Sequence, residues 1–395
     1  MRVTEVSPSR VVLEMAVREF APPRDQMPRL FVAGAVHIAN QSFYEQLQEL
    51  LDAQTIVLFE GVKPPGSGDT AHDLAEDQND DRRAEAVKRR VRFIAMAIER
   101  YRADHKKYPA DLAELLSGSD HRIATLLTGA TTDAWGNLLV YELDESGKKF
   151  DVLSFGADGE PGGEGAAADI RYSQQRPLSR SESGDRSGGI QKKLAEALGV
   201  VFQLEAMDHD KPNWRNSDLS IDQVQQRLEQ GGGNADQLFS MLDGSSFVGM
   251  LAGFFLDLMS ADPRSRAMLK LMLMETVTVA DEMLEAAPGG MREFMQVILD
   301  DRNAVVIQDL KRILEEESPE TIGIIYGAGH LPKLERDLVA QLGYRPVGDR
   351  WLCAMEVDAE SANMTQAEFV RMREMMARVL KMQLENARKA GKKKR

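Results

Sequence analysis

Two histidines follow apolar runs near opposite ends of the chain. His37 lies in "FVAGAVHIA" at residues 31–39, and His330 lies in "IIYGAGHLP" at residues 324–332. Histidine is well suited to metal ligation or to proton transfer near neutral pH. Glu60 ends a third apolar run, "IVLFE", and a carboxylate beside a buried strand is costly unless it has a partner. Two imidazoles and one carboxylate predict a divalent metal set or an acid–base group.

These side chains need strands that end at one edge of a sheet. Residues 29–36 and 55–61 have the pattern of strands, and residues 41–53 between them have helical spacing, so 29–61 predicts β-α-β. "TIGIIYGAG" predicts another strand just before His330. Since open α/β sheets bind ligands at the carboxyl ends of their strands, we expect His37, Glu60 and His330 at one rim.

Glycines accompany both histidines. Gly34, Gly327 and Gly329 can adopt positive φ for a tight turn, or can let a substrate or metal approach the backbone. A single Gly-x-x-His motif is weak evidence, because a histidine at a strand end is often a hydrogen-bonded structural residue. The pair of motifs together with Glu60 favours a functional site.

The rest of the chain predicts one α/β domain with an insertion. Polar, glycine-rich stretches at 64–83 and 179–189 have the composition of linkers. The domain comprises residues 1–63 and 190–395, with strands at 10–19 and 200–207 and a mostly helical block at 219–318. A small α+β module occupies residues 84–172, where the pattern predicts helices followed by two strands.

Composition limits the classes of partner. The 395 residues carry a net charge of −14, so nucleic acid is not expected to bind the body of the protein. The basic tail "RKAGKKKR" predicts a solvated helix terminus, with a nucleic-acid or membrane contact as the alternative. The most apolar segment, 247–259, is too short to span a bilayer. With one cysteine, Cys353, no disulfide can form within the chain.

No signal peptide is evident at the start of the sequence. A cytoplasmic location is expected if Met1 is the native start, and an extracytoplasmic one if a leader was removed. The sequence does not indicate an oligomeric state.

Four segments in order resemble the TIKI/TraB/GumN family: "VAGAVHIANQSFYEQL", "IVLFEG", "LDDRNAVVIQDL" and "YGAGHLPKLERDLVAQLGY". The resemblance implies a TraB-like sheet with a large helical block and a bacterial, metal-dependent hydrolase, such as a peptidase using Mn, Co or Zn. It implies that His37 and His330 are metal or catalytic histidines and that Glu60 is a ligand or base. Arg302 and Asn303 are then catalytic residues that orient the substrate or the carboxylate. From the residues alone, Arg302 is as well explained as a helix-surface residue paired with Asp301.

Residues 84–172 resemble a second family, the major pseudopilin of type II secretion. The resemblance rests on "IAMAIERYRADHKKYPADLAELL", "DAWGNLLVYE" and "KFDVLSFGADGEPGGEGAAADI". The membrane-spanning N-terminal helix of a pseudopilin is not seen, and the stretch 64–83 stands in its place, so we expect no membrane span. The resemblance implies calcium bound by Asp158 and Asp169, with carbonyls near Leu153 and Gly156. Calcium takes six to eight oxygen ligands, and this glycine-rich loop is acidic. Ala166 and Ala167 depart from the pattern, and the alternative is a loop that has lost its metal.

Three functions remain open. The first is a metal-dependent hydrolase whose module binds a protein or peptide substrate or partner. The second is a non-catalytic binding or assembly protein linked to secretion. The third, weaker one is a sensor that holds a small ligand or haem at the sheet rim.

Overall fold

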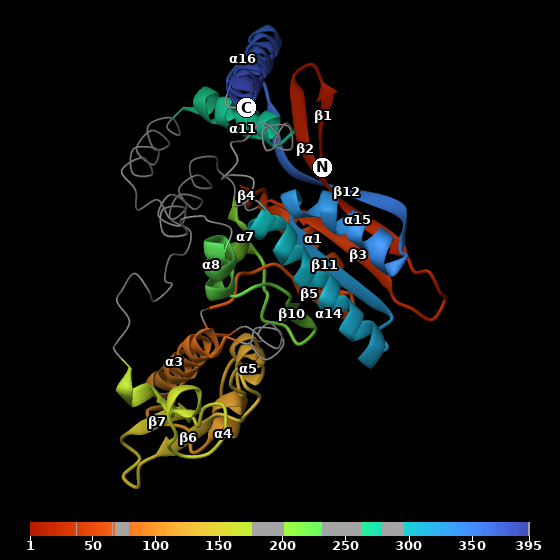
Figure 1. The fold of residues 1–395 in the computed structure, drawn as a ribbon. Helices are drawn as coiled ribbons and strands as arrows, with labels where there is room; N and C mark the ends of the chain where they lie inside the picture. Colours follow the sequence, from red (N-terminus) through yellow and green to blue (C-terminus); the bar gives the residue numbers. More distant parts are fainter. Residues whose placement is uncertain are drawn as a thin grey trace. The chain divides into compact units, whose positions relative to one another are not determined.

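The computed structural model describes residues 1–36, 38–64, 66–67, 79–175, 201–230, 262–278 and 296–393. Within them the protein is mixed α/β (Figure 1). The chain divides into two compact units: unit 1 is Met1–Glu60, Arg186–Asp208 and Arg227–Arg395, and unit 2 is Gly61–Asp185 and His209–Gln226. Residues 209–226 thus group with unit 2, although their pattern was assigned to the α/β domain. His37, most of the predicted linkers and segment 247–259 lie outside the described residues.

Three parallel strands form the centre of the sheet in unit 1. β11 (Thr321–Gly327) lies between β3 (Arg29–Ala35) and β5 (Ile56–Phe59) and is parallel to both. Between β3 and β5 the chain passes through β4 (Ile38–Ala39) and α1 (Gln41–Asp52), so the predicted β-α-β unit is confirmed. In register, Gly327 lies beside Ala35, and Ile325 lies beside Phe59. The three strands therefore end at the same edge.

Antiparallel strands extend this sheet. β2 (Arg10–Ala21) pairs with β3, with β1 (Arg2–Ser7) and, along its whole length, with β12 (Arg345–Asp358). β1 was not predicted, because its short run "RVTEVS" is polar and no residue in it is buried. β12 is one continuous strand with two register shifts.

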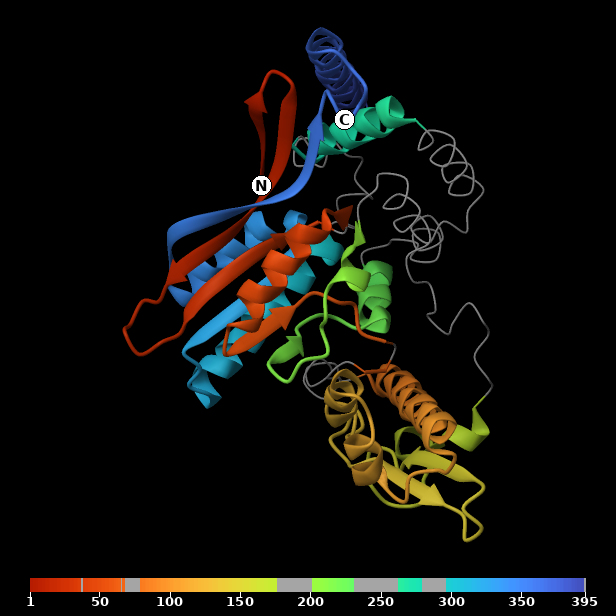
Figure 2. The ribbon, with the colours of Figure 1, turned by 180° about the vertical axis from the view of Figure 1, so that it is seen from behind.

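Helices cover both faces of the sheet. α14 (Arg302–Glu316) and α15 (Leu331–Leu342) pack Leu310 and Leu334 against Ile324 and its neighbours. α1 lies over the other face of the sheet (Figure 2). A Cβ added to Gly323 of β11 would lie 2.9 Å from Leu51 of α1. Burial of apolar surface between these layers is the main source of stability of unit 1.

The predicted helical block at 219–318 is confirmed where it is described, and it consists of α8 (Ile221–Gln230), α11 (Pro263–Thr278), the π-helical turn η3 (Gln296–Asp301) and α14.

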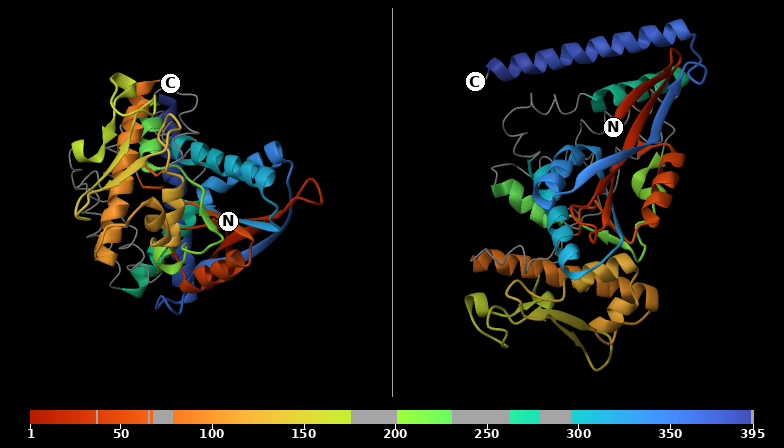
Figure 3. Two further views of the ribbon diagram at one scale, coloured as in Figure 1. Left: turned by 90° about the horizontal axis from the view of Figure 1, so that it is seen from below. Right: turned by 90° about the vertical axis from the view of Figure 1, so that its right-hand side faces the viewer.

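The predicted strand at 200–207 was wrong for most of its length. Only β9 (Val201–Phe202) pairs, with β4, and the chain then turns into α7 (Gln203–Ala206). α16 (Gln366–Lys393) follows β12 and packs against α11, and it lies at the periphery of unit 1 in the right-hand view of Figure 3. No described helix is long and apolar enough to cross a membrane.

Unit 2 has its own core. α3 (Asp80–His105) packs against a three-stranded antiparallel sheet, and Ile94, Ile98 and Val152 are fully buried between them. Asp111 and Asp120 cap the helices that follow α3 by accepting backbone hydrogen bonds. The remaining elements are α4 (Leu112–Ser117), α5 (His121–Thr128), β6 (Val140–Leu143), β7 (Phe150–Ser154), η1 (Gly165–Ala167), β8 (Ile170–Arg171), η2 (Tyr172–Gln174) and β10 (Trp214–Asn216).

Candidate functional site

Four predicted site residues meet at the carboxyl edge of the parallel strands. Glu60 follows β5 directly, and His330 ends the 3₁₀ turn η4 (Ala328–His330) after β11. Arg302 and Asn303 open α14 and are buried at the same edge. The rim arrangement therefore holds for Glu60 and His330. His37, the other predicted member, lies outside the described residues.

Glu60 is held on both carboxylate oxygens. Arg302 donates from Nη2 to Glu60 Oε1 at 2.7 Å, and the Gly327 backbone N–H donates to Oε2. The backbone N–H of Glu60 donates to the carbonyl of Ile325, which continues the β5–β11 pairing. The side chains of Glu60 and Arg302 are 15% and 7% exposed, so the ion pair is poorly screened by solvent.

Arg302 was equally well explained from the sequence as a surface residue paired with Asp301. That alternative is wrong, because Arg302 is buried against Glu60. Asp301 instead lies 3.7 Å from Arg227. The adjacent residues Asp301 and Arg302, at the junction of η3 and α14, thus have different partners.

Asn303 fixes the ring of His330. The Asn303 Nδ2 donates to the His330 carbonyl at 3.0 Å, so Asn303 Oδ1 faces His330 Nδ1, at 2.8 Å. This amide orientation requires a proton on Nδ1. Asn303 is fully buried, and the edge-to-face contact with Tyr326, 5.1 Å between ring centroids, also restricts the imidazole.

The other nitrogen of His330 lies between opposite charges. His330 Nε2 is 3.5 Å from Glu60 Oε1 and 3.4 Å from Arg302 Nη1. A protonated Nε2 can donate to the carboxylate, and an unprotonated Nε2 can accept from the guanidinium. The cluster can therefore hold or release one proton at a defined atom.

The carboxyl group of Glu60 is held ionised. Burial by itself raises its pKa, but the hydrogen bond from His330, the charges of Arg302 and His330, and the Gly327 N–H outweigh burial. Together they lower the pKa of Glu60 far below its ordinary value. At neutral pH Glu60 is thus an anion and an acceptor of protons or hydrogen bonds.

The donor atoms of this cluster decide whether it alone can hold the predicted Mn, Co or Zn. Glu60 Oε1 and His330 Nε2 are near enough to share an ion, but they are only two donors, and Arg302 places a positive charge on the same carboxylate oxygen. No cluster of three or more His, Cys, Asp or Glu side chains able to hold a metal occurs in the described ranges. The described residues alone do not fit a transition metal, and that site remains a prediction that depends on His37.

Two of the three glycines near these histidines, Gly34 and Gly327, leave space that a side chain would fill. The predicted positive φ was wrong at Gly34, Gly327 and Gly329, none of which has that conformation. A Cβ on Gly327 would lie 3.1 Å from Glu60 Oε2, and one on Gly34 would lie 3.1 Å from Leu331. Sequence reasoning missed that the Gly327 N–H binds Glu60. The sequence feature that could have indicated this contact is a glycine at the end of one strand together with a carboxylate at the end of a neighbouring buried strand.

In unit 2 a buried aspartate ties two loops together. Asp133 Oδ1 accepts from the backbone N–H groups of Trp135 and Asn137, and its Oδ2 accepts from Ser154 Oγ at 2.6 Å. Asn137 Nδ2 donates to the Gly156 carbonyl at 2.8 Å. The "DAWGN" loop is thereby fastened to the start of the "SFGADG" loop, and one of the carbonyls expected to bind calcium already accepts a hydrogen bond.

The two predicted calcium ligands bind the backbone of their own loop. Asp158 Oδ1 accepts from Glu160 N at 3.2 Å, and Asp169 Oδ1 accepts from Gly162 N at 2.9 Å. Asp169 Oδ2 lies 3.9 Å from Arg171 Nε. The structure thus links Asp158 and Asp169 to the same loop without joining them in one carboxylate cluster, and calcium binding stays a prediction.

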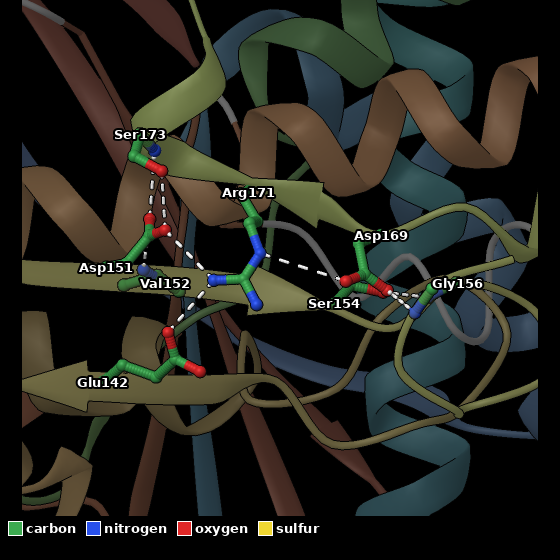
Figure 4. Close-up of polar contacts among 9 residues, drawn as sticks. Glu142, Asp151, Val152, Ser154, Gly156, Asp169, Arg171 and Ser173 are labelled. Atoms are coloured by element: carbon green, nitrogen blue, oxygen red, sulfur yellow. Dashed lines mark hydrogen bonds and ion pairs between the residues drawn. The ribbon is translucent and has the colours of Figure 1, made fainter.

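Arg171 neutralises acidic side chains on the small sheet. Its Nη1 lies 3.0 Å from Glu142 and 3.5 Å from Asp151, and Figure 4 shows Asp169 on the other side of the guanidinium. Asp151 also accepts from both the backbone N–H and the hydroxyl of Ser173. These contacts join all three strands of the module to the segment that follows them.

Comparison with known proteins addresses only this module. Residues 75–173 match the family model of "Type II secretion system (T2SS), protein G". The chain is 31% identical over 94 residues to the type II secretion system core protein G of Xanthomonas campestris pv. campestris, an alignment that covers 23% of this chain and 66% of that relative. The chain thus spans just under two thirds of the relative's length. No solved structure matches significantly.

The TIKI/TraB/GumN resemblance receives no support from these comparisons, whereas the pseudopilin resemblance does. Residues 75–173 are therefore a domain of the type II secretion protein G kind.

Proposed function

We propose that this protein is a non-catalytic binding or assembly protein that acts with a type II secretion apparatus, using its pseudopilin-like module to engage a protein partner. The observation that carries the proposal is the 31% identity over 94 residues to a core protein of that apparatus. The module has its own hydrophobic core and buried polar network, which supports a unit that recognises partners in its own right.

The kind of partner is inferred from the similarity of the module to the Xanthomonas protein G. Proteins of an assembly recognise one another through surfaces with apolar centres and polar rims. Among the described residues of the module, Leu138 and Met96 are exposed large apolar side chains, at 72% and 50%. We assign the partner as another protein of the type II secretion apparatus, with its protein G as the first candidate.

The test measures binding to the purified globular part of the Xanthomonas protein G. The full chain should bind, and Leu138→Asp/Met96→Asp should weaken binding at least about tenfold, which is typical of losing an interface anchor. Val339→Asp, also at an exposed apolar position but in unit 1, is the matched control and should bind like wild type. Absence of binding by the wild-type chain, or an equal loss in the control, would contradict the proposal.

A second candidate is a hydrolase of the TIKI/TraB/GumN type. The observation favouring it is the convergence of Glu60, Arg302, Asn303 and His330 at one strand edge. In this reading Asn303 holds the imidazole, His330 Nε2 moves a proton, and Arg302 keeps Glu60 ionised and orients it. A divalent metal, where His37 completes a ligand set with Glu60 and His330, would supply an activated water.

Elemental analysis separates the two candidates. Purified wild type and His37→Ala/His330→Ala are compared after calcium has been removed by mild chelation and Mn, Co or Zn has been offered. Near-stoichiometric metal in wild type, absent from the double variant, supports the hydrolase and justifies a peptidase assay. Equal metal content in both proteins, or none in either, rejects the metal-dependent form.

A further inference from the structure

The C-terminal helix α16 has an apolar stripe that neither candidate function uses. Among the α16 side chains that the structure describes, Phe369 and Met376 are buried, and the helix packs against α11. Met375, Val379 and Met382 are instead exposed, by 51%, 42% and 57%. Their spacing of four and then three residues places them on one helical face. Among the described residues, this is the longest run of exposed large apolar side chains on one element.

Basic side chains border this stripe. A surface groove on α16 is lined by Arg371, Met375, Arg378, Val379 and Met382, with no carboxylate among them. Arg371 and Arg378 are two helical turns apart, so they lie along the same edge of the stripe. The Arg378 side chain is 78% exposed, which leaves its charge accessible although Glu374 is 3.4 Å away. We call these five residues the α16 strip.

The charge of α16 contrasts with the rest of the protein. Residues 366–393 hold eight Lys and Arg and three Asp and Glu, a net charge of +5. The whole chain carries −14, so the remainder carries −19. After Glu385 every charged residue to the end of the sequence is basic. Positive charge is therefore gathered on the one helix that also exposes an apolar stripe.

We propose that α16 lies along an anionic lipid surface, with Met375, Val379 and Met382 at the boundary of headgroups and acyl chains and with Arg371 and Arg378 on lipid phosphates. A helix that is apolar on a stripe and basic beside it is typical of an element lying in the membrane interface. This inference does not depend on either proposed function.

Charge favours this occupant over others. A second copy of α16 carries the same +5 and is repelled from the first. A protein partner needs a matched pattern of acids along the helix, and the basic end after Glu385 offers it no apolar anchor. A lipid surface suits both the strip and the basic end of α16, because its charge is laterally continuous and attracts each nearby Lys or Arg.

The test is co-sedimentation of the full chain with vesicles. Wild type should bind phosphatidylcholine vesicles containing about 30% phosphatidylglycerol at about 0.1 M salt and be released at about 1 M salt. It should not bind vesicles of phosphatidylcholine alone. Arg371→Glu/Arg378→Glu should weaken binding about thirtyfold or more. Met375→Asp/Met382→Asp should weaken it in the same direction.

Control variants distinguish lipid binding by the α16 strip from a general effect of the charge of the protein. Arg350→Glu and Val347→Asp change an exposed basic and an exposed apolar residue on β12 and should bind like wild type. A chain ending at Glu385 should retain part of the binding, since the strip is intact. All variants change exposed side chains, and circular dichroism should confirm that they fold like wild type.

Three results would overturn the proposal. One is equal binding to neutral and anionic vesicles, and another is binding lost on truncation at Glu385 but unchanged by the strip substitutions. The third is a dimer in sedimentation velocity without lipid that dissociates in Met375→Asp/Met382→Asp, which would assign the strip to a second copy of the chain.

Discussion

The guanidinium of Arg302 donates a 2.7 Å hydrogen bond to Glu60 Oε1 although 242 positions separate the two residues in the chain. This buried ion pair joins the first turn of α14 to the end of β5. It also holds in place the carboxylate that faces His330. The pair is therefore structural for unit 1 whether or not the cluster is catalytic.

Replacing Glu60 with Ala should destabilise unit 1 by about 3–5 kcal/mol, because the buried guanidinium loses its carboxylate. Hydrogen exchange of β11 amides, which report the opening of the sheet, measures the change. Glu356→Ala removes the carboxylate of an exposed pair with Arg10 and is the matched control, with an expected effect of about 0–1 kcal/mol. Equal effects in the two variants would contradict a buried, stabilising pair.

The low pKa of Glu60 makes part of the stability pH-dependent. A carboxyl group whose pKa is lower in the folded than in the unfolded state stabilises the fold above its unfolded value of 4.5. That contribution is lost as pH falls below this value toward the folded pKa. The difference in melting temperature between wild type and Glu60→Gln should therefore shrink from pH 6 to pH 3, as measured by scanning calorimetry. A difference that stays constant or grows over this range would show that the pKa is not lowered.

The imidazole of His330 should carry its proton on Nδ1 when neutral, because Asn303 Oδ1 accepts from that nitrogen. Nitrogen-15 shifts of labelled histidine report the tautomer directly. Asn303→Ala removes both contacts to His330, and we expect a mixed tautomer together with a loss of about 2–4 kcal/mol of stability. A neutral ring protonated on Nε2 in wild type would reject the assigned amide orientation.

In the module, Asp133→Ala should cost about 2–4 kcal/mol, because three donors that Asp133 accepts from become unsatisfied in a buried site. Thermal unfolding of the full chain in a calcium chelator provides the measurement. Asp158→Ala is the control, since Asp158 is exposed and accepts only a long hydrogen bond from Glu160 in its own loop. Its expected effect is within about 0.5 kcal/mol.

Calcium should raise the melting temperature of the module if the pseudopilin resemblance extends to its metal. At a calcium concentration about 100 times the dissociation constant, the gain corresponds to about 2.7 kcal/mol. Asp158→Ala/Asp169→Ala should lose this gain, whereas Glu142→Ala, on β6 rather than in the loop, should keep it. A calcium response that is unchanged in the double variant would place the ion elsewhere or show that the response is unspecific.

The rule that parallel strands end at one edge was enough to place Glu60 near His330 from the sequence. The position of Arg302 could not be predicted this way, because it depends on how α14 packs over the sheet. From the sequence, the adjacent Asp301 was an equally good partner for Arg302. The structure favours Glu60 over Asp301, because Arg302 is buried. The glycines were expected either to bend the backbone or to let a substrate or metal come close, and local sequence cannot distinguish a need for positive φ from a need for space. At Gly327 the space is taken by the Glu60 carboxylate.

The module was predicted more completely because its contacts are local. The helices and the two strands expected within 84–172 correspond to α3, α4, β6 and β7. Strand β1 was missed because its stability comes from pairing with β2 rather than from an apolar pattern of its own.

The position of β11 between β3 and β5 has a consequence for synthesis of the chain. The N-terminal strands emerge from the ribosome long before residues 321–327, and at common elongation rates the delay is roughly 15 to 60 s. Until then β3 and β5 lack the strand that joins them, and their unpaired edges can associate with other chains. The contiguous module can fold within that interval. The order of translation therefore leaves the sheet of unit 1 as the part of the protein most dependent on protection while the chain is being made.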